Sequence, residues 1–415
     1  PLSATTAKPG RPQLRPWYFV LCFGLVSLFA DMVYEGARSI IGPYLAFLGA
    51  SAAVVGTVAG VGEFIGYGLR VVSGYLVQRG KHYWTWTITG YALTVLSVPL
   101  IGATNVIAPV LLLYGTERLG KAVRSPAKDT LLSHASTQTG PGTAFGVHQA
   151  MDQLGAMAGP LLLAAVLAQR ADNYRLAFGV LVVPGAIVLA LLFWLRHRVP
   201  DPAAYEDEAP TPAPKVAVDE GGTKVSRHAL PPLLWKYIGA VALLSLGIAS
   251  FPLLAYHAVT QQLLTDAQVP LVFALAMLVD GVSGLLMGRI YDLRGPKVLL
   301  AVPVAACGAA IAFSDKAALV WLGVAIWGVV NGVLDSTVKA VVTELVPSQT
   351  RSIAFGWLAF VRGLGLLVGG VAMGIAYDRS VALVVVLILG SNLVALAALT
   401  RVMRHLPGVG VGQVT

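Results

Sequence analysis

Three charged side chains stand inside an apolar stretch near the start of the chain. Asp31, Glu35 and Arg38 are spaced by four and then three residues, so on a helix they share one face. Glu35 and Arg38 can form an ion pair, which leaves Asp31 free to exchange a proton. A charge in the middle of a bilayer costs about 2.5–3.5 kcal/mol even on a lenient insertion scale. We therefore expect this stripe to line a water-accessible path.

A second charged stripe lies in a later apolar stretch. Glu117, Lys121, Arg124 and Lys128 recur at helical spacing, with Arg118 alongside. Two interpretations are open. The stripe lines a cavity and takes part in coupling, or it belongs to a static ion-pair network that fixes helix packing.

Two histidines and a fourth arginine add further chemistry. His148 and Asp152 are one helical turn apart, a pattern that suits a proton relay, a first-row divalent metal or an Asp that orients a packed His. His257 follows Pro252, and broken helices of secondary transporters often expose polar groups to substrate, although a lone His is also a common packing residue. Arg362 has no obvious partner on its own helix and could anchor an anionic group.

Long apolar stretches must position these side chains. The chain has 415 residues, of which 56% are hydrophobic and 12% charged, against about 25% charged residues in a soluble domain. The apolar stretches are long enough to cross about 30 Å of hydrocarbon as helices, and they exceed the roughly 10 residues of a barrel strand. We predict an all-α membrane protein with twelve transmembrane helices. The predicted spans lie near residues 17–42, 51–77, 84–104, 107–127, 143–169, 174–196, 233–260, 267–290, 298–315, 317–340, 352–377 and 381–403.

The basic residues predict the topology. Lys and Arg gather at alternate helix ends, for example at Arg79 and Lys81, whereas the connections near 43–51, 104–107 and 261–268 have none. This is the positive-inside pattern, and it places both termini in the cytoplasm. The net charge of +9 is thus distributed over the helix ends, so no contiguous basic face is left to bind nucleic acid.

One segment differs in composition from the rest of the chain. Residues 197–232 are rich in proline, acidic and small residues and are predicted to form a flexible cytoplasmic linker. The linker divides the spans six and six. We therefore predict an N-terminal bundle over residues 1–196 and a C-terminal bundle over residues 233–415.

The two predicted bundles repeat a glycine series. The spacings of nine and four residues recur 210 positions later, and small residues let helix backbones approach closely in lipid. Repeated six-span halves are typical of transporters built from two related bundles. The series are Gly146, Gly155 and Gly159, and Gly356, Gly365 and Gly369.

Several motifs resemble the major facilitator superfamily of transporters, and the resemblance covers nearly the whole chain. The loop between the second and third spans of each half in that superfamily reads roughly G-x3-D-R/K-x-G-R/K. The second-half loop "GRIYDLRGPK" is similar to it, whereas the first-half loop "GYLVQRGK" has Gln78 where Asp is expected. The resemblance implies a gating role for these loops. The matching residues are Gly74 and Arg79 in the first half and Gly288, Asp292 and Arg294 in the second.

Two further segments extend the resemblance. "GVHQAMDQLGAMAGP" is similar to the antiporter signature G-x8-G-x3-G-P, matched by Gly146, Gly155, Gly159 and Pro160, which implies exchange rather than uniport. "YGTERLGKAVRSPAKD" resembles the helix with a buried Arg that many proton-coupled members use, and Arg118 fits this position. The first and fourth helices of each half line the central cavity in this superfamily. The resemblance thus implies that the two charged stripes face each other.

A narrower likeness concerns "ADMVYEG" and the His-x3-Asp of "GVHQAMD". These segments are similar to a bacterial branch of the superfamily that includes nickel-resistance and ferroportin-like metal exporters, although a His-rich tail is absent. No phosphate-cradling G-x4-G-K-[ST] loop, serine elbow or CxxC pair appears, so we expect neither an enzyme nor a cofactor.

These observations lead to a functional prediction. We predict a proton-coupled antiporter that exports a small solute by alternating access, as a monomer in the bilayer of the bacterial cytoplasmic membrane. An exporter of a divalent metal ion or metal chelate is the alternative. A lipid flippase and a non-transporting membrane sensor are also open.

Overall fold

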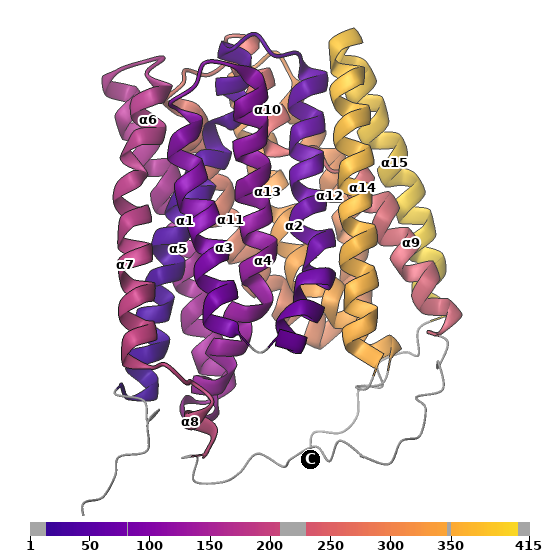
Figure 1. The fold of residues 1–415 in the computed structure, drawn as a ribbon. Coiled ribbons are helices and arrows are strands. Elements are labelled where there is room, and N and C mark those ends of the chain that lie inside the picture. The colour runs from indigo at the N-terminus through magenta and orange to yellow at the C-terminus, as the bar shows by residue number, and fades with distance from the viewer. Residues whose placement is uncertain (1–13, 81, 208–229, 347–349, 406–415) are drawn as a thin grey trace, which may run out of the picture.

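The computed structural model describes residues 14–80, 82–207, 230–346 and 350–405, and its described residues form helices joined by short connections. The long helices run side by side (Figure 1). The N-terminal half consists of α1 (Pro16–Phe47), α2 (Ala52–Gly80), α3 (Tyr83–Ile101), α4 (Ile107–Thr139), α5 (Pro141–Gln169), α6 (Tyr174–Val180), α7 (Val182–Arg198) and α8 (Ala204–Asp207). The C-terminal half consists of α9 (Pro232–Leu246), α10 (Phe251–Thr260), α11 (Gln268–Arg294), η1 (Gly295–Leu300), α12 (Ala301–Ala309), η2 (Ala310–Phe313), α13 (Ala317–Leu345), α14 (Arg351–Arg379) and α15 (Val381–Met403).

Ten helical stretches of the described chain are long and apolar enough to cross a membrane. One of them, Gln268–Phe313, contains two helical passes, because Gly295 adopts a φ of +70° that ends α11. The fourth predicted span is absent from the ten because α4 carries the second charged stripe. The predicted number of spans, twelve, is therefore larger than ten because one stretch contains two passes and the charged α4 is not counted.

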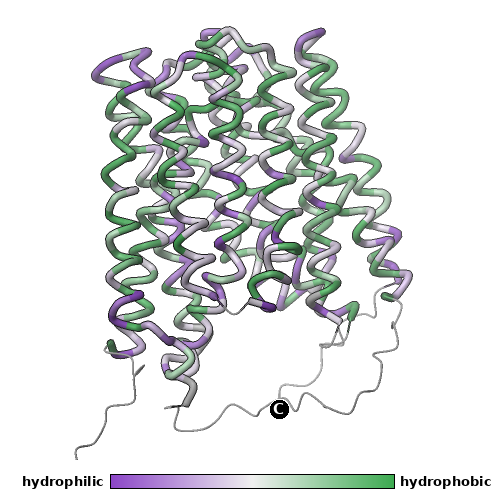
Figure 2. Tube along the Cα trace, viewed as in Figure 1, coloured by the Kyte–Doolittle hydropathy of each residue, from purple (hydrophilic) through white to green (hydrophobic). Residues whose placement is uncertain are grey.

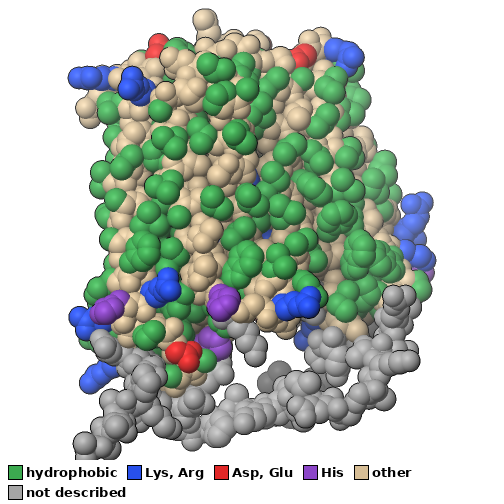
Figure 3. Space-filling model, in the orientation of Figure 1, with side chains coloured by type: hydrophobic (Ala, Val, Ile, Leu, Met, Phe, Trp, Pro, Cys, Tyr) green, Lys and Arg blue, Asp and Glu red, His purple; other side chains and the backbone are tan. Residues whose placement is uncertain are grey.

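The outer surface suits a bilayer. Figure 2 shows apolar residues along most of each helix, with hydrophilic residues mainly at the two ends and at a few interior positions. Hydrophobic side chains cover the flank in Figure 3, and Lys, Arg and His side chains gather toward the ends. Such an apolar band between two polar rims is expected of a protein surrounded by lipid.

The repeated glycines allow the same kind of close helix contact in the two halves. Gly155 and Gly159 bring α5 against the backbone of α1, where a Cβ would collide with the carbonyls of Leu28 and Met32. Gly365 and Gly369 bring α14 against the backbone of α9 in the same way, at the carbonyls of Ala242 and Leu246. Close backbone approach in lipid is rewarded by dispersion and weak Cα–H contacts.

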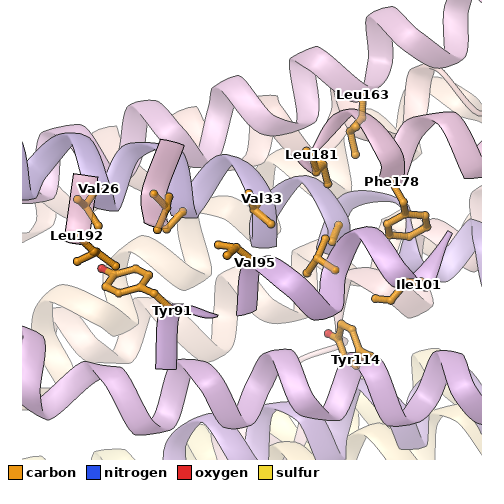
Figure 4. Packing of buried hydrophobic residues seen from close by; sticks show 14 of the residues in the cluster. Val26, Val33, Tyr91, Val95, Ile101, Tyr114, Leu163, Phe178, Leu181 and Leu192 are labelled. Atoms are coloured by element: carbon orange, nitrogen blue, oxygen red, sulfur yellow. The ribbon is translucent and has the colours of Figure 1, made fainter. Parts of the chain in front are cut away.

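Buried apolar side chains form one cluster in the N-terminal half and two clusters that lie mainly in the C-terminal half. The cluster of the N-terminal half joins all helices from α1 to α8, and Figure 4 shows Val33, Val95 and Leu181 of this cluster packed between neighbouring helices. In lipid, such packing stabilises by close contact rather than by removal of apolar surface from water. The result is a tightly packed support for the charged side chains.

The segment predicted as a flexible linker begins with ordered structure. Tyr205 on α8 is buried, and its hydroxyl donates to the Leu14 carbonyl at 2.8 Å. Gln138 Nε2 donates to the Tyr205 carbonyl at 2.6 Å, which ties α8 to α4. This packing orders the first part of the segment, and residues 208–229 lie outside the described part.

Candidate functional site

A cavity of about 1900 Å³ lies between the two halves. It is lined by α1, α2, α3, α4 and α5 from the N-terminal half and by α11, α13 and α14 from the C-terminal half. The lining reaches Gln78 and Asp129, which are exposed near the ends of α2 and α4. The C-terminal end of α2 and the N-terminal end of α1 lie at the same end of the molecule, which is drawn at the bottom of Figure 1. The cavity therefore opens at this end.

The two halves touch at the opposite end. The Tyr256 hydroxyl donates to the Ala50 carbonyl at 3.1 Å. The Asp378 carboxylate accepts from the backbone N–H groups of Ala52 at 2.9 Å and Ala53 at 3.0 Å, so that α14 caps the beginning of α2. A carboxylate is favourable there because the helix N-terminus has a partial positive charge.

Two loops add a carboxyl pair to this closed end. The Tyr174 hydroxyl donates to Asp266 Oδ1 at 2.9 Å, and the Asp172 N–H donates to Asp266 Oδ2 at 3.3 Å. The side chains of Asp172 and Asp266 also share a hydrogen bond, and this bond raises the pKa of Asp172. The pair joins the loop before α6 to the loop before α11.

The stripe on α1 divides into a paired part and an unpaired part. Arg38 Nη1 lies 3.4 Å from Glu35 Oε2, which confirms the expected pair, and Arg38 Nη2 lies 3.2 Å from Glu63 Oε1 on α2. Asp31 lines the cavity and is only 8% exposed. No Lys or Arg nitrogen of the described residues lies within 4.0 Å of its carboxylate.

The stripe on α4 meets the stripe on α1. Lys121 Nζ lies 3.9 Å from Glu35 Oε1, and Arg118 Nη1 lies 3.7 Å from Glu63 Oε1. Arg118 Nε is also 2.9 Å from Glu117 Oε2, and both of these residues are buried. Glu63 thus contacts cations of two helices. Spacing along α2 could not predict these contacts, because both cations belong to other helices.

The next two cations of α4 are held by different groups. Arg124 Nη1 donates to Thr94 Oγ1 at 2.9 Å, and the Arg124 guanidinium lies against the rings of Tyr34 and Tyr91. Lys128 Nζ lies 3.8 Å from Asp152 Oδ2. Both cations line the cavity, and each is held by neighbouring side chains of the N-terminal half rather than left free.

His148 is buried beside this network. Its Nε2 is hydrogen-bonded to Ser27 Oγ at 2.8 Å, and its Nδ1 lies 3.4 Å from Asp152 Oδ2. Within the described part of the chain, no group of three or more His, Cys, Asp or Glu side chains could hold a metal ion. The metal interpretation therefore has two donors here, one of which already faces Lys128.

His257 lies away from the cavity. Its Nδ1 is hydrogen-bonded to the Tyr377 hydroxyl at 2.9 Å and its Nε2 to the Ser314 carbonyl at 3.0 Å. Both ring nitrogens are used, and the side chain is 2% exposed. The geometry fits a packing residue of the C-terminal half. The position after Pro252 does not expose it, because neighbouring polar groups fill the space.

Arg362 lines the cavity from α14. Its Nη1 donates to Asp335 Oδ1 at 3.0 Å, and its guanidinium carbon lies 4.9 Å from the centre of the Tyr67 ring. The partner that its own helix lacks is therefore supplied by α13, and an aromatic neighbour is supplied by α2.

The motif residues expected to act in gating lie on α2, α5 and α11. Gly74 lines the cavity opposite Pro126, and Pro160 lies on the buried side of α5 next to Gly159. Among the described residues, no hydrogen bond or ion pair joins the loop residues of the first half to those of the second. Gly288 has open space around its Cα, while Arg79, Asp292 and Arg294 are exposed.

This arrangement defines a class of protein. Membrane-crossing helices in two repeated halves enclose a cavity that is open at one end and closed at the other, with ionisable groups at its wall. These are the features of a secondary transporter that works between two related bundles.

The comparisons with known proteins identify the family. Residues 23–370 and 238–409 match the model of the Major Facilitator Superfamily. The chain belongs to this superfamily of secondary transporters, and it is not an enzyme. An uncharacterized protein of Mycobacterium tuberculosis is 46% identical over 388 residues, which are 93% of each chain. An uncharacterized MFS-type transporter of Methanocaldococcus jannaschii is 22% identical over 371 residues, 87% of this chain and 89% of the other.

A solved structure supports the fold. The nucleoside transporter NupG, as a mutant, superposes with a TM-score of 0.75 at 12% sequence identity, over 92% of this chain and 99% of its own. The protein is therefore a multi-pass membrane protein with the superfamily fold and with bacterial relatives.

Proposed function

We propose that the protein is a proton-coupled antiporter that exports a small solute by alternating access across the bacterial cytoplasmic membrane. The main support for this proposal is that Asp31 lines the cavity with no Lys or Arg nitrogen of the described residues within 4.0 Å of its carboxylate. Glu35 and Glu63, by contrast, each lie within 4.0 Å of a cation. A proton carrier must alternate between charged and neutral forms, and an ion-paired carboxylate is held in its charged form. Asp31 is therefore our proton carrier.

The proposal includes twelve spans, with α4 as the one that composition alone excludes. Its charges turn toward α1, α2 and α5, where Glu35, Glu63 and Asp152 balance them. A charged helix can cross a membrane when its charged face meets other protein. With both termini in the cytoplasm, as the basic residues predict, the cavity opens to the cytoplasm in this conformation.

A flux measurement tests the proposal. The purified chain is first screened by thermal shift against a panel of metabolites and drugs, because a ligand of the folded state raises apparent stability. A solute that stabilises the protein is then followed into proteoliposomes under an imposed pH gradient.

Asp31→Asn should abolish accumulation driven by the gradient while solute exchange without a gradient continues. Asp129→Asn is the matched control, because Asp129 lines the same cavity but its side chain is 63% exposed. Accumulation that ignores the gradient, or that survives in Asp31→Asn, would refute proton coupling through this residue.

Export of a divalent metal ion or chelate is the second candidate, and the proximity of His148 and Asp152 favours it. Growth on nickel, cobalt and iron salts, with wild-type or His148→Ala protein, tests it. Equal tolerance of all strains, including one that lacks the protein, would exclude metal export.

A further inference from the structure

We infer that the transported solute is an organic anion with a planar apolar body, and that Arg70 and Arg362 bind its anionic group from the two halves. This inference rests on the proposed transport function and names the substrate class of the same cavity. Four features of the cavity wall between α2 and α14 support it.

The first feature is the placement of the two arginines. Both line the cavity, Arg70 on α2 and Arg362 on α14. The guanidinium carbons of Arg70 and Arg362 lie 5.3 and 4.9 Å from the centre of the same Tyr67 ring. They are therefore no further apart than the sum of these distances, about 10 Å. At any separation up to this bound, two cations in a partly buried site repel each other, and an anion that contacts both removes that repulsion.

The second feature is the shortage of negative charge beside them. Among the described residues, no carboxylate lies within 4.0 Å of the Arg70 guanidinium, and its Nε is buried without a hydrogen-bond partner. Arg362 is paired with Asp335, but the Asp335 side chain is 59% exposed and remains accessible to water. The Arg362 side chain is only 11% exposed, but the carboxylate of its partner faces water, so an incoming carboxylate or phosphate can compete with Asp335 for the guanidinium.

The third feature is a contrast with the cations of α4 that line the cavity. Lys121 and Lys128 each lie within 4.0 Å of a carboxylate. The Arg124 guanidinium is enclosed by Thr94 and two tyrosine rings. On the wall between α2 and α14, the guanidinium N–H donors that lack a carboxylate partner among the described residues are thus those of Arg70. The planar guanidinium of Arg362 adds a second group whose N–H donors match a carboxylate or phosphate.

The fourth feature is the aromatic surface next to the arginines. The Phe64 and Phe360 rings meet edge to face at 5.6 Å, and Trp357 lies 6.1 Å from Phe360. These side chains also line the cavity. A planar apolar group can stack on such rings while its anionic end reaches the guanidinium groups.

The site is divided between the halves. Arg70, Tyr67 and Phe64 belong to α2, whereas Arg362, Phe360 and Trp357 belong to α14. An anion held by both arginines therefore contacts both halves at once, and its affinity depends on their relative position. This coupling is what alternating access requires of a substrate.

Binding of three related probes to the full-length chain in detergent tests the inference. The probes are 2-naphthoate, 2-naphthalenemethanol and 2-naphthylmethylammonium, which share the ring but are anionic, neutral and cationic. We expect 2-naphthoate to bind at least ten-fold more tightly than the other two by calorimetry. Arg70→Gln and Arg362→Gln should each weaken 2-naphthoate binding at least ten-fold and leave binding of the alcohol unchanged.

Two further variants guard against a trivial loss of binding. Arg289→Gln removes an exposed arginine of α11 and should bind like the wild type. Arg362→Lys keeps the charge but loses the planar fork, so it should weaken binding less than Arg362→Gln.

The inference is overturned if the alcohol or the ammonium probe binds as tightly as 2-naphthoate. It is also overturned if 2-naphthoate does not bind, or if only one of the two arginines matters. Binding does not depend on a pH gradient, so its failure is distinct from a failure of proton coupling. If 2-naphthoate binds but no flux occurs, the substrate class stands and the transport proposal fails.

Discussion

The pair formed by Glu117 and Arg118 gives a sharp stability prediction. Each side chain is 1% exposed, and Arg118 Nε lies 2.9 Å from Glu117 Oε2. Neither Glu117 oxygen has a hydrogen-bond partner in the described structure, so Arg118 compensates its charge electrostatically. Breaking a buried pair by removing one partner costs about 3–5 kcal/mol, because an uncompensated charge stays buried. We expect Arg118→Met to destabilise the protein by this amount.

The two remaining variants of the cycle behave differently. Glu117→Gln should cost less, because Arg118 keeps Glu63 at 3.7 Å and the Tyr114 hydroxyl at 3.0 Å. The double variant removes both charges, and replacing a buried pair by neutral groups of similar volume is often nearly neutral. The double variant should therefore regain at least about 2 kcal/mol relative to Arg118→Met, a coupling well beyond the additivity of independent sites.

The measurement is unfolding of the purified protein in mixed micelles of dodecyl maltoside and increasing SDS, followed by tryptophan fluorescence. Arg289→Met, at an exposed arginine, should stay within about 0.5 kcal/mol of the wild type. A double variant as unstable as Arg118→Met would refute the electrostatic explanation and assign the loss to the missing side-chain volume. An unchanged Arg118→Met would refute the pair itself.

Two other predictions concern packing and pH. Gly159→Ala should destabilise the protein by about 1–3 kcal/mol, although alanine favours helices, because the new Cβ meets the α1 backbone; Gly390→Ala, with open space around it, should be neutral or stabilising in the same unfolding assay. The raised pKa of Asp172 beside Asp266 means that the closed end binds a proton more tightly than separated loops do. Acid should therefore favour the closed end, and this preference should fade as pH rises through the raised pKa. Spin-label distances between the two loops should increase with pH in the wild type but not in Asp172→Asn, and a pH-independent wild type would contradict the explanation.

The sequence predicts well those features that repeat along one helix. The stripe of Asp31, Glu35 and Arg38 has a regular spacing, and the pair of its last two members is present in the structure. The doubled glycine series is similarly visible because close packing imposes small residues at fixed intervals. At Gly159 the structure supplies the reason, which is the carbonyl of α1 that a side chain would meet.

Such patterns cannot predict which side chains of different helices contact each other. Glu63 contacts Arg38 on one side and Arg118 on the other, but three different helices supply these residues. Tyr67 lies against two arginines, and only the packing of α2 on α14 brings Arg362 to it. Spacing within one helix says nothing about its rotation against another, so neither site could be derived from the chain alone.

The distribution of charge also shows where the conformational change can occur. The ion pairs between α1, α2 and α4 lie within the N-terminal half, and separating them would expose several buried charges at once. The contacts that close the far end include hydrogen bonds, such as those of Tyr256 with the Ala50 carbonyl and of Asp378 with two backbone N–H groups of α2, and none of these joins two opposite charges. Each is worth about 0.5–3 kcal/mol. The halves should thus move as packed units while the far end opens. A proton on Asp31 would alter the charge of the α1 wall, and an anion on Arg70 and Arg362 would alter the cost of separating α2 from α14, so both ligands can bias the same movement.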